Sequence, residues 1–293
     1  MWEIVLWNWK HSSVFASEDD TIGKRYILHF VPNFIVAFNS MSVTMTSYNT
    51  LKTGIHFDED SNATRPYILL SNFPFDNNKQ VYIFIIFLQF FYVLILFSAA
   101  TTINSVLLVI LIMHLGHQID VICECLMKMS SEENMRKTNV TMMKETIRQH
   151  QSVITFSENI EYLYTYIALI LVLFSSIISC GLSFVLVVSI ASPHFSKIVK
   201  KNIMFFGVVT IESFIFCFAG EYLSSKSREI GEPAYSSPWY QSKFHGHAVL
   251  FMIMKWQNQL TITMGKFACL SLELFSSIIT TSGSYVSVLL AMY

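Results

Sequence analysis

Charged residues are scarce in this chain. Asp, Glu, Lys and Arg make up 13% of its 293 residues, whereas apolar residues make up 53% and the mean hydropathy is +0.48. This composition excludes an ordinary soluble domain and predicts an integral membrane protein. The formal net charge of −1 provides no excess of positive charge, so we expect no nucleic acid partner.

Catalytic and metal-binding motifs are missing as well. The sequence contains no Gly-rich phosphate loop, no nucleophile elbow and no His-Glu-x-x-His motif. Its five cysteines have neither zinc-site spacing nor the pattern of a small disulfide framework, so free thiols are expected. We therefore predict no enzyme, no cofactor and no metal site.

The N-terminus lacks the features of a signal peptide. Residues 1–25 contain Glu3, Glu18, Asp19 and Asp20 and no continuous apolar stretch. The first membrane span is therefore expected to direct the chain to the membrane.

Long hydrophobic runs predict an all-α, multi-span transmembrane protein of about five membrane helices with cytoplasmic helical extensions. The segments long enough to cross a hydrocarbon core are 26–48, 81–114, 162–192, 203–220 and 267–292. The second should form one long helix, because no Gly or Pro interrupts it before Gly116. The first contains Asn33 and Asn39, which need protein neighbours rather than lipid.

The distribution of basic residues predicts the orientation. A cytoplasmic N-terminus places thirteen Lys and Arg residues inside and six outside, and with five spans the C-terminus is extracellular. The sequon Asn62-Ala63-Thr64 lies in the 49–80 loop, so Asn62 should carry a glycan. The second sequon, at Asn139, would lie inside and stay unmodified.

The last span, 267–292, has an unusual number of hydroxyl groups. Its only charge is Glu273, yet eight serines and threonines recur from Ser271 to Ser287. Hydroxyls bond between membrane helices, and small residues such as Gly283 allow close packing. The composition is thus compatible with helix contacts or with the lining of a pore.

Several motifs closely resemble the signature of insect odorant receptors. The C-terminal part carries Thr263-Met264-Gly265-Lys266-Phe267, Leu270-Ser271-Leu272-Glu273-Leu274-Phe275 and Ser282-Gly283-Ser284-Tyr285. Upstream blocks are Ala234-Tyr235-Ser236-Ser237-Pro238-Trp239-Tyr240 and Asn72-Phe73-Pro74-Phe75-Asp76. Departures from the family are Gln259 in place of a usual proline, Pro238 in place of an acidic or small residue, and Asn72 in place of an aromatic residue.

The resemblance implies a single domain over 1–293 that corresponds to spans three to seven of a seven-span receptor. Its parts would be a cytoplasmic lead-in at 1–25, an extracellular loop at 49–80, a cytoplasmic anchor region at 221–266 and a pore helix at 267–292. Met1 is then expected to lie inside a longer receptor.

The resemblance also implies a function. Such a subunit would sit in the plasma membrane of olfactory neurons, bind a small volatile molecule in the outer half of the bundle, and gate a cation channel as a hetero-tetramer with the shared odorant co-receptor. The residues implied are, for the pore and gate, Tyr285, Val288 and Met292; for the ligand pocket, Tyr82, Phe84, Phe87, Phe91, Phe205, Phe206 and Glu212; and for the subunit anchor, Tyr235, Trp239 and Tyr240. Core packing or lipid contact remains an alternative for each pocket aromatic, and a structural hydrogen bond remains one for Glu212.

Other receptor classes fit less well. A gustatory receptor of the same superfamily would pair a tyrosine with a downstream Gln-Phe, but Tyr285 is followed by Val286-Ser287-Val288-Leu289-Leu290. A G-protein-coupled receptor would carry Asp-Arg-Tyr or Asn-Pro-x-x-Tyr elements, which the sequence lacks. A non-functional truncated receptor fragment stays open as an alternative.

Overall fold

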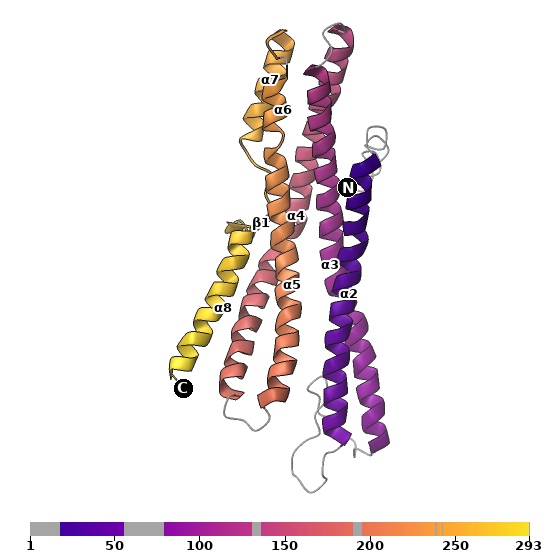
Figure 1. Ribbon diagram of the computed structural model, residues 1–293, viewed down its shortest axis with the longest axis vertical. Helices are drawn as coiled ribbons and strands as arrows, with labels where there is room; N and C mark the ends of the chain where they lie inside the picture. Colours follow the sequence, from indigo (N-terminus) through magenta and orange to yellow (C-terminus); the bar gives the residue numbers. More distant parts are fainter. Residues whose placement is uncertain are drawn as a thin grey trace. The chain divides into compact units, whose positions relative to one another are not determined.

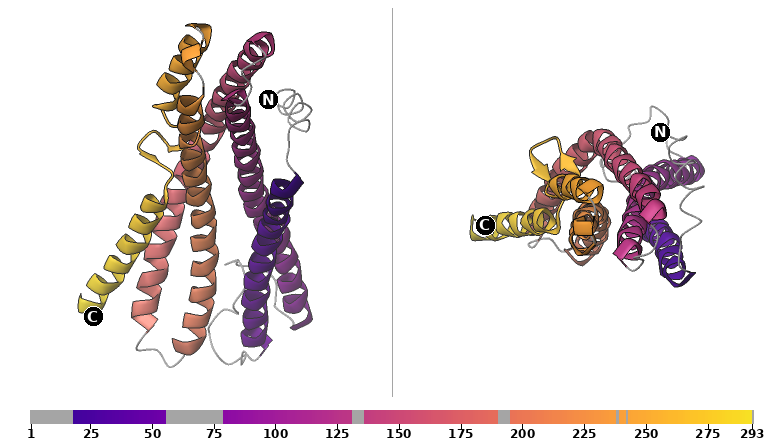
Figure 2. Two further views of the ribbon diagram at one scale, coloured as in Figure 1. Left: turned by 45° about the horizontal axis from the view of Figure 1, so that its top comes forward. Right: turned by 90° about the horizontal axis from the view of Figure 1, so that it is seen from above.

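The computed structural model describes residues 18–55, 79–130, 136–189, 195–237, 239–241 and 243–292. Long helices dominate these residues (Figure 1). They are α2 (Glu18–Ile55), α3 (Lys79–Ser130), α4 (Arg136–Ser189) and α5 (Phe195–Arg228). After them come α6 (Gly231–Ser236), the 3-10 turn η1 (Trp239–Gln241), α7 (Lys243–Trp256), the strands β1 (Thr263–Met264) and β2 (Ala268–Cys269), and α8 (Leu272–Met292) (Figure 2). The all-α prediction is confirmed.

Helix α3 is unbroken, as predicted from the absence of Gly and Pro between Val81 and Gly116. Its 52 residues give a length of roughly 78 Å at about 1.5 Å per residue, more than twice a hydrocarbon core of roughly 30 Å. Helix α4 likewise begins well before the predicted span at 162–192.

Two predicted boundaries are wrong. The loop expected at 49–80 is shorter, because α2 continues to Ile55 and α3 begins at Lys79. The α2 sequence has no helix breaker after Pro32 until Gly54, and Lys52 in its last turn suits the negative end of the helix dipole. The helix expected from 267 begins only at Leu272, because residues 263–269 form a β-hairpin.

The hairpin depends on a tight turn. The amide of Phe267 donates to the carbonyl oxygen of Met264 at 3.0 Å, and Thr263 pairs with Cys269. Both central residues have positive φ, 57° at Gly265 and 64° at Lys266, as hairpin turns of this kind require. Glycine meets this requirement without strain, whereas Lys266 adopts it at a steric cost.

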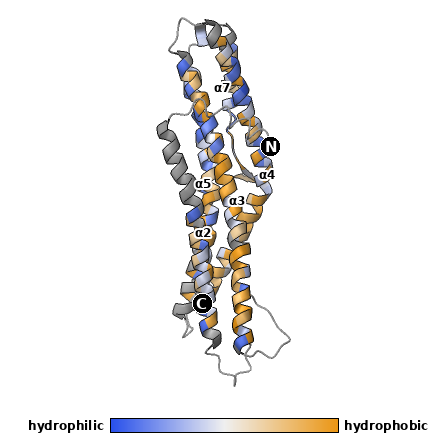
Figure 3. Ribbon diagram, turned by 90° about the vertical axis from the view of Figure 1, so that its right-hand side faces the viewer, coloured by the Kyte–Doolittle hydropathy of each residue, from blue (hydrophilic) through white to orange (hydrophobic). Residues whose placement is uncertain are grey.

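Among the described residues, three segments are long and apolar enough to cross a membrane: Gln80–Lys128, Val140–Val185 and Phe205–Ser236. Hydrophobic residues run along much of α3 in Figure 3. The predicted spans at 26–48 and 267–292 are also helical, and their crossing of the membrane stays a prediction.

The chain divides into two compact units. The first comprises residues 1–28, 107–174 and 213–280, and the second comprises 29–106, 175–212 and 281–293. The core of the first unit is apolar and uses one face of α3 at intervals of three and four residues, with Leu108, Leu115, Ile119, Ile122 and Leu126 fully buried.

The second unit buries many polar residues. Asn39 is only 3% exposed, and its Nδ2 donates to Thr101 Oγ1 at 2.9 Å, which gives the asparagine the protein neighbour that it needs. Asn33 is exposed, whereas Asn39 has the protein contact that the sequence analysis expects of a polar residue in this span. Its partner lies 62 positions away in the sequence, so local pattern cannot reveal the contact.

Candidate functional site

The predicted anchor residues line an open aromatic groove. The groove has a volume of about 520 Å³ and is formed by Tyr235, Trp239, Tyr240, Gly246, His247, Val249, Leu250 and Ile253. Tyr235 and Tyr240 are 70% and 76% exposed, and Trp239 is 42% exposed. The structure thus brings together, around one hollow, the three aromatic residues that the sequence indicated.

Local contacts orient the Trp239 ring and stabilise the backbone around it. The indole Nε1 of Trp239 donates to the carbonyl oxygen of Tyr235 at 3.2 Å, and the Trp239 and Tyr240 rings meet edge to face at 6.1 Å. The hydroxyl of Ser237 donates to the carbonyl oxygen of Ala234 at 2.7 Å and stabilises the end of α6. Trp239 is therefore held in the groove by one hydrogen bond and one ring contact.

Close packing joins α6 to the end of α7. A Cβ atom at Gly231 would lie 2.4 Å from the Trp256 ring, so only glycine fits. The Nε1 of Trp256 donates to the carbonyl oxygen of Arg228 at 2.9 Å. Gln259, which departs from the family pattern, accepts hydrogen bonds at its Oε1 from Arg228 Nη2 at 3.0 Å and from Ser224 Oγ at 3.2 Å.

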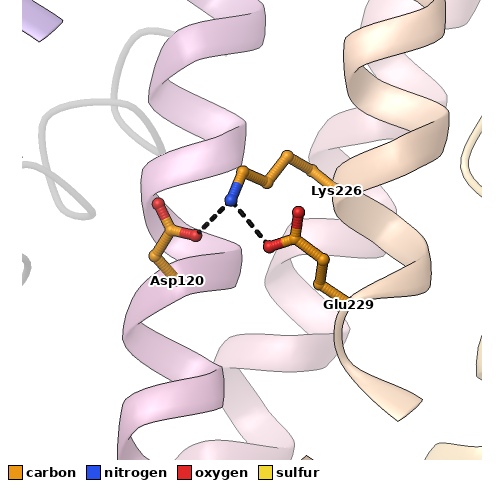
Figure 4. A network of polar contacts seen from close by, with 3 residues as sticks. All are labelled: Asp120, Lys226 and Glu229. Atoms are coloured by element: carbon orange, nitrogen blue, oxygen red, sulfur yellow. Dashed lines mark hydrogen bonds and ion pairs between the residues drawn. The ribbon is translucent and has the colours of Figure 1, made fainter. Parts of the chain in front are cut away.

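An ion network links α3 to the C-terminal end of α5 (Figure 4). Lys226 Nζ lies 3.0 Å from Asp120 Oδ1 and 2.7 Å from Glu229 Oε2. One turn earlier on each helix, a Cβ atom at Gly116 would lie 2.9 Å from the Tyr222 ring. The same two helices are thus joined by charge and by close packing, neither of which the sequence analysis identified.

The hairpin is attached to α4 and α5. Thr263 Oγ1 donates to Glu161 Oε1 at 2.6 Å, and the amide of Gly265 donates to the carbonyl oxygen of Thr165 at 3.2 Å. On the other side, a Cβ atom at Gly220 would lie 2.5 Å from the carbonyl oxygen of Leu270. Because α8 begins two residues after Leu270, these contacts fix the position at which α8 starts.

Helix α8 packs through a narrow stripe and is exposed elsewhere. Leu274, Phe275 and Ile278 pack against the core of the first unit, and Ser282 is 7% exposed. Six other serines and threonines are exposed: Ser276, Ser277, Thr280, Thr281, Ser284 and Ser287. Most of the serines and threonines therefore lie away from the face of α8 that packs within this chain. Gly283 also faces open space, because a Cβ atom there would meet nothing within 4 Å.

The predicted gate residues lie in the second half of α8. Tyr285 is 50% exposed and Val288 is 58% exposed, three residues apart and hence on one side of the helix. The side chain of Met292 lies outside the described set.

The predicted pocket residues have different environments. Tyr82 is 1% exposed, whereas Phe84, Phe87 and Phe91 are 66%, 60% and 42% exposed. The rings of Phe87 and Phe91 meet edge to face at 4.7 Å. Phe205 is 37% exposed, and Phe206 and Glu212 are half-buried. The structure therefore pairs two of these residues and separates the buried Tyr82 from the exposed phenylalanines of α3.

Three buried polar atoms of the described residues have no hydrogen-bond partner. They are Thr102 Oγ1 and Ser105 Oγ on α3 and Asn202 Nδ2 on α5. No sequence pattern marks these three positions, because single Ser, Thr and Asn residues are common in apolar helices.

Known proteins match most of this chain. The family model described as 7tm Odorant receptor matches residues 14–283. Odorant receptor 67c of Drosophila melanogaster is 23% identical over 256 residues, which cover 86% of this chain and 62% of that protein. Odorant receptor 13a of the same organism is 25% identical over 176 residues, covering 56% of this chain and 42% of that receptor. The chain thus spans about three fifths or less of the length of these relatives.

The fold is shared with a solved receptor. The olfactory receptor OR5 of Machilis hrabei superposes with a TM-score of 0.64 at 16% identity, over 92% of this chain and 70% of that protein. A second structure of that receptor, in complex with eugenol, gives the same TM-score at 18% identity. The resemblance inferred from the sequence motifs is confirmed: the chain belongs to the odorant receptor family, a family of multi-pass membrane receptors and not of enzymes.

Proposed function

We propose that this chain forms part of an odorant receptor subunit that binds a small volatile molecule and, with the shared co-receptor, gates a cation channel in olfactory neurons. The observation that carries the proposal is α8, whose exposed residues are rich in hydroxyls and which starts from a hairpin attached to α4 and α5. Family membership over residues 14–283 supports the receptor role.

The proposed ligand site lies in the second unit. All seven predicted pocket residues, from Tyr82 on α3 to Glu212 on α5, belong to that unit. Exposed aromatic rings such as Phe87 and Phe91 suit a small apolar ligand, which apolar and aromatic side chains usually line. The complex of the Machilis receptor with eugenol supports the same ligand class.

The proposed pore is formed by α8 from four subunits. Ser276, Thr280, Ser284 and Ser287 would offer hydroxyls to passing cations, and Val288 with Met292 would form an apolar constriction. Contact of the same residues with lipid or with another helix is the competing explanation.

The proposed co-receptor contact is the aromatic groove of α6, η1 and α7. Exposed Tyr and Trp side chains at a hollow are typical of the residues that dominate protein interfaces.

The proposed topology places the N-terminus in the cytoplasm and the C-terminus outside the cell. It predicts a glycan on Asn62, which lies outside the described residues, and none on Asn139, which is part of α4. Treatment with an N-glycosidase should increase the gel mobility of the wild type and of Asn139→Gln but leave Asn62→Gln unchanged. The reverse pattern would invert the topology.

The function can be tested by recording currents in cells that express the co-receptor. A receptor extended at its N-terminus to the length of its relatives should give odour-evoked cation currents, and residues 1–293 alone should not. The loss of current is expected because residues 1–293 match only 62% of the length of Odorant receptor 67c, and because polar positions such as Asn33 are exposed. Robust currents from residues 1–293 would contradict the expectation that ligand binding and gating need the longer receptor.

A gustatory receptor or a non-functional fragment would respond differently. A gustatory receptor would respond to soluble tastants without the odorant co-receptor, and a non-functional fragment would stay silent even after extension.

A further inference from the structure

The exposed surface of α4 changes abruptly from polar to apolar. Between Thr141 and Glu158 its exposed positions are Thr141, Lys144, Arg148, Gln151, Thr155 and Glu158. From the next turn to the end of the first unit they are Tyr162, Leu163, Tyr166, Ile170, Leu173 and Phe174. This helix carries one of the segments able to cross the membrane, and Tyr is enriched where such helices leave the hydrocarbon. We therefore expect the edge of the membrane on α4 to lie at the level of Tyr162.

The tip of the β-hairpin lies at the same level. The amide of Gly265 donates to the carbonyl oxygen of Thr165 at 3.2 Å, one residue from Tyr166. A Cβ atom at Gly265 would lie 3.0 Å from Leu169 and 3.2 Å from the Phe267 ring, so the ring sits beside this part of α4.

The two residues at the tip are both exposed and differ in chemistry. Phe267 is 83% exposed, the largest value among the exposed apolar side chains of the described residues. Lys266 is exposed, and no carboxylate of the described residues pairs with it. Its positive φ of 64° is held by the turn, which fixes the point where its side chain leaves the backbone.

We propose that the hairpin tip is a binding site for anionic phospholipid, with Phe267 inserted at the level of Tyr162 and Tyr166 and Lys266 paired with a headgroup. The site continues the apolar surface of α4 and adds one cation at the membrane edge, where basic side chains attract anionic lipid. Phe267 extends the contiguous apolar surface of α4, and the membrane interface accommodates an aromatic ring at this level.

The site has a consequence for α8. The hairpin ends at Cys269 and α8 starts at Leu272, so a lipid bound at the tip contacts the segment that fixes the start of α8. The inference needs only that the chain is a membrane protein and does not rest on odorant binding or channel activity.

Tryptophan quenching by brominated lipids tests the proposal. The 293-residue chain, synthesised into nanodiscs, would carry Phe267→Trp, and the signal of the unsubstituted chain would be subtracted. Brominated phosphatidylcholine should quench the fluorescence of the tryptophan at 267. Brominated phosphatidylserine, present as the same fraction of the nanodisc lipid, should quench it more strongly, because the anionic lipid should be enriched near the tip by up to about fivefold. Met254→Trp is the matched control, because Met254 is 60% exposed and belongs to α7 rather than to the hairpin.

The charge is tested in the Phe267→Trp background. Lys266→Asn removes the cation with a residue that tolerates positive φ, and should make the two lipids quench equally. Lys266→Arg should keep the preference. Absence of quenching at residue 267, or a preference for phosphatidylserine that survives Lys266→Asn, would overturn the proposal.

Discussion

Replacing Trp239 with alanine should weaken assembly with the co-receptor about thirtyfold, since truncating a central aromatic anchor commonly costs about 2 kcal/mol or more. The variant removes the edge contact with Tyr240 and the hydrogen bond from Nε1 to the Tyr235 carbonyl oxygen. Because Trp239 is already 42% exposed, its loss should affect folding of the subunit much less than assembly. Co-purification of the extended receptor with a tagged co-receptor, titrated over concentration, measures the change.

Phe251→Ala is the matched control for this experiment. Phe251 is 48% exposed on α7, which contributes other residues to the groove, but Phe251 itself does not line the groove. Its substitution should leave assembly unchanged. Equal assembly of Trp239→Ala and wild type would assign the aromatic cluster to local packing of α6 and η1.

Substituting serine for Val288 should raise the current that flows without odorant. An apolar constriction closes a pore by excluding water, so a hydroxyl at that position favours a hydrated, open pathway. Val288 is 58% exposed, and substitution should therefore disturb packing within the subunit little. Met292 lies four residues further along α8 and so shares its face.

The neighbouring substitution Leu289→Ser separates a gate from a general effect of polarity. Position 289 lies about 100° around the helix, so its serine should lower surface expression rather than open the pore. Whole-cell recordings, normalised to surface protein, compare both variants with wild type. An unchanged basal current in Val288→Ser, or an increase only in Leu289→Ser, would place the gate on another face of α8.

Local patterns in the sequence predicted the helices well. The absence of Gly and Pro from 81 to 115 predicted α3. Within the segment expected as the anchor region, 221–266, the structure forms the helix α7, at Lys243–Trp256. The same patterns failed at 267–271, because the pairing of Thr263 with Cys269 competes with the N-terminal extension of α8.

Contacts between distant residues could not be predicted. Lys226 and Asp120 are 106 positions apart, and Thr263 and Glu161 are 102 apart. Lys, Asp, Thr and Glu are all common on solvated surfaces, so neither pair has a local sequence signature.

Burial on α3 could not be predicted either. The helix is apolar on all sides, and such a helix has no periodicity that separates its packed face from its exposed face. Tyr82 and Phe84 are only two residues apart, yet Tyr82 is 1% exposed and Phe84 is 66% exposed. The pocket candidates therefore remain predictions, whereas the anchor aromatics could be grouped because three of them lie within six residues.

The central claim, that α8 lines a cation pore, is tested most directly by modifying a cysteine placed at Val288. In an extended receptor assembled with its co-receptor, a positively charged thiol reagent applied during odour stimulation should permanently abolish most of the current of Val288→Cys. The parent receptor, whose exposed native thiol at Cys269 precedes α8, should keep its current under the same treatment. Modification of Val288→Cys, verified by mass spectrometry, without any change in current would contradict the account.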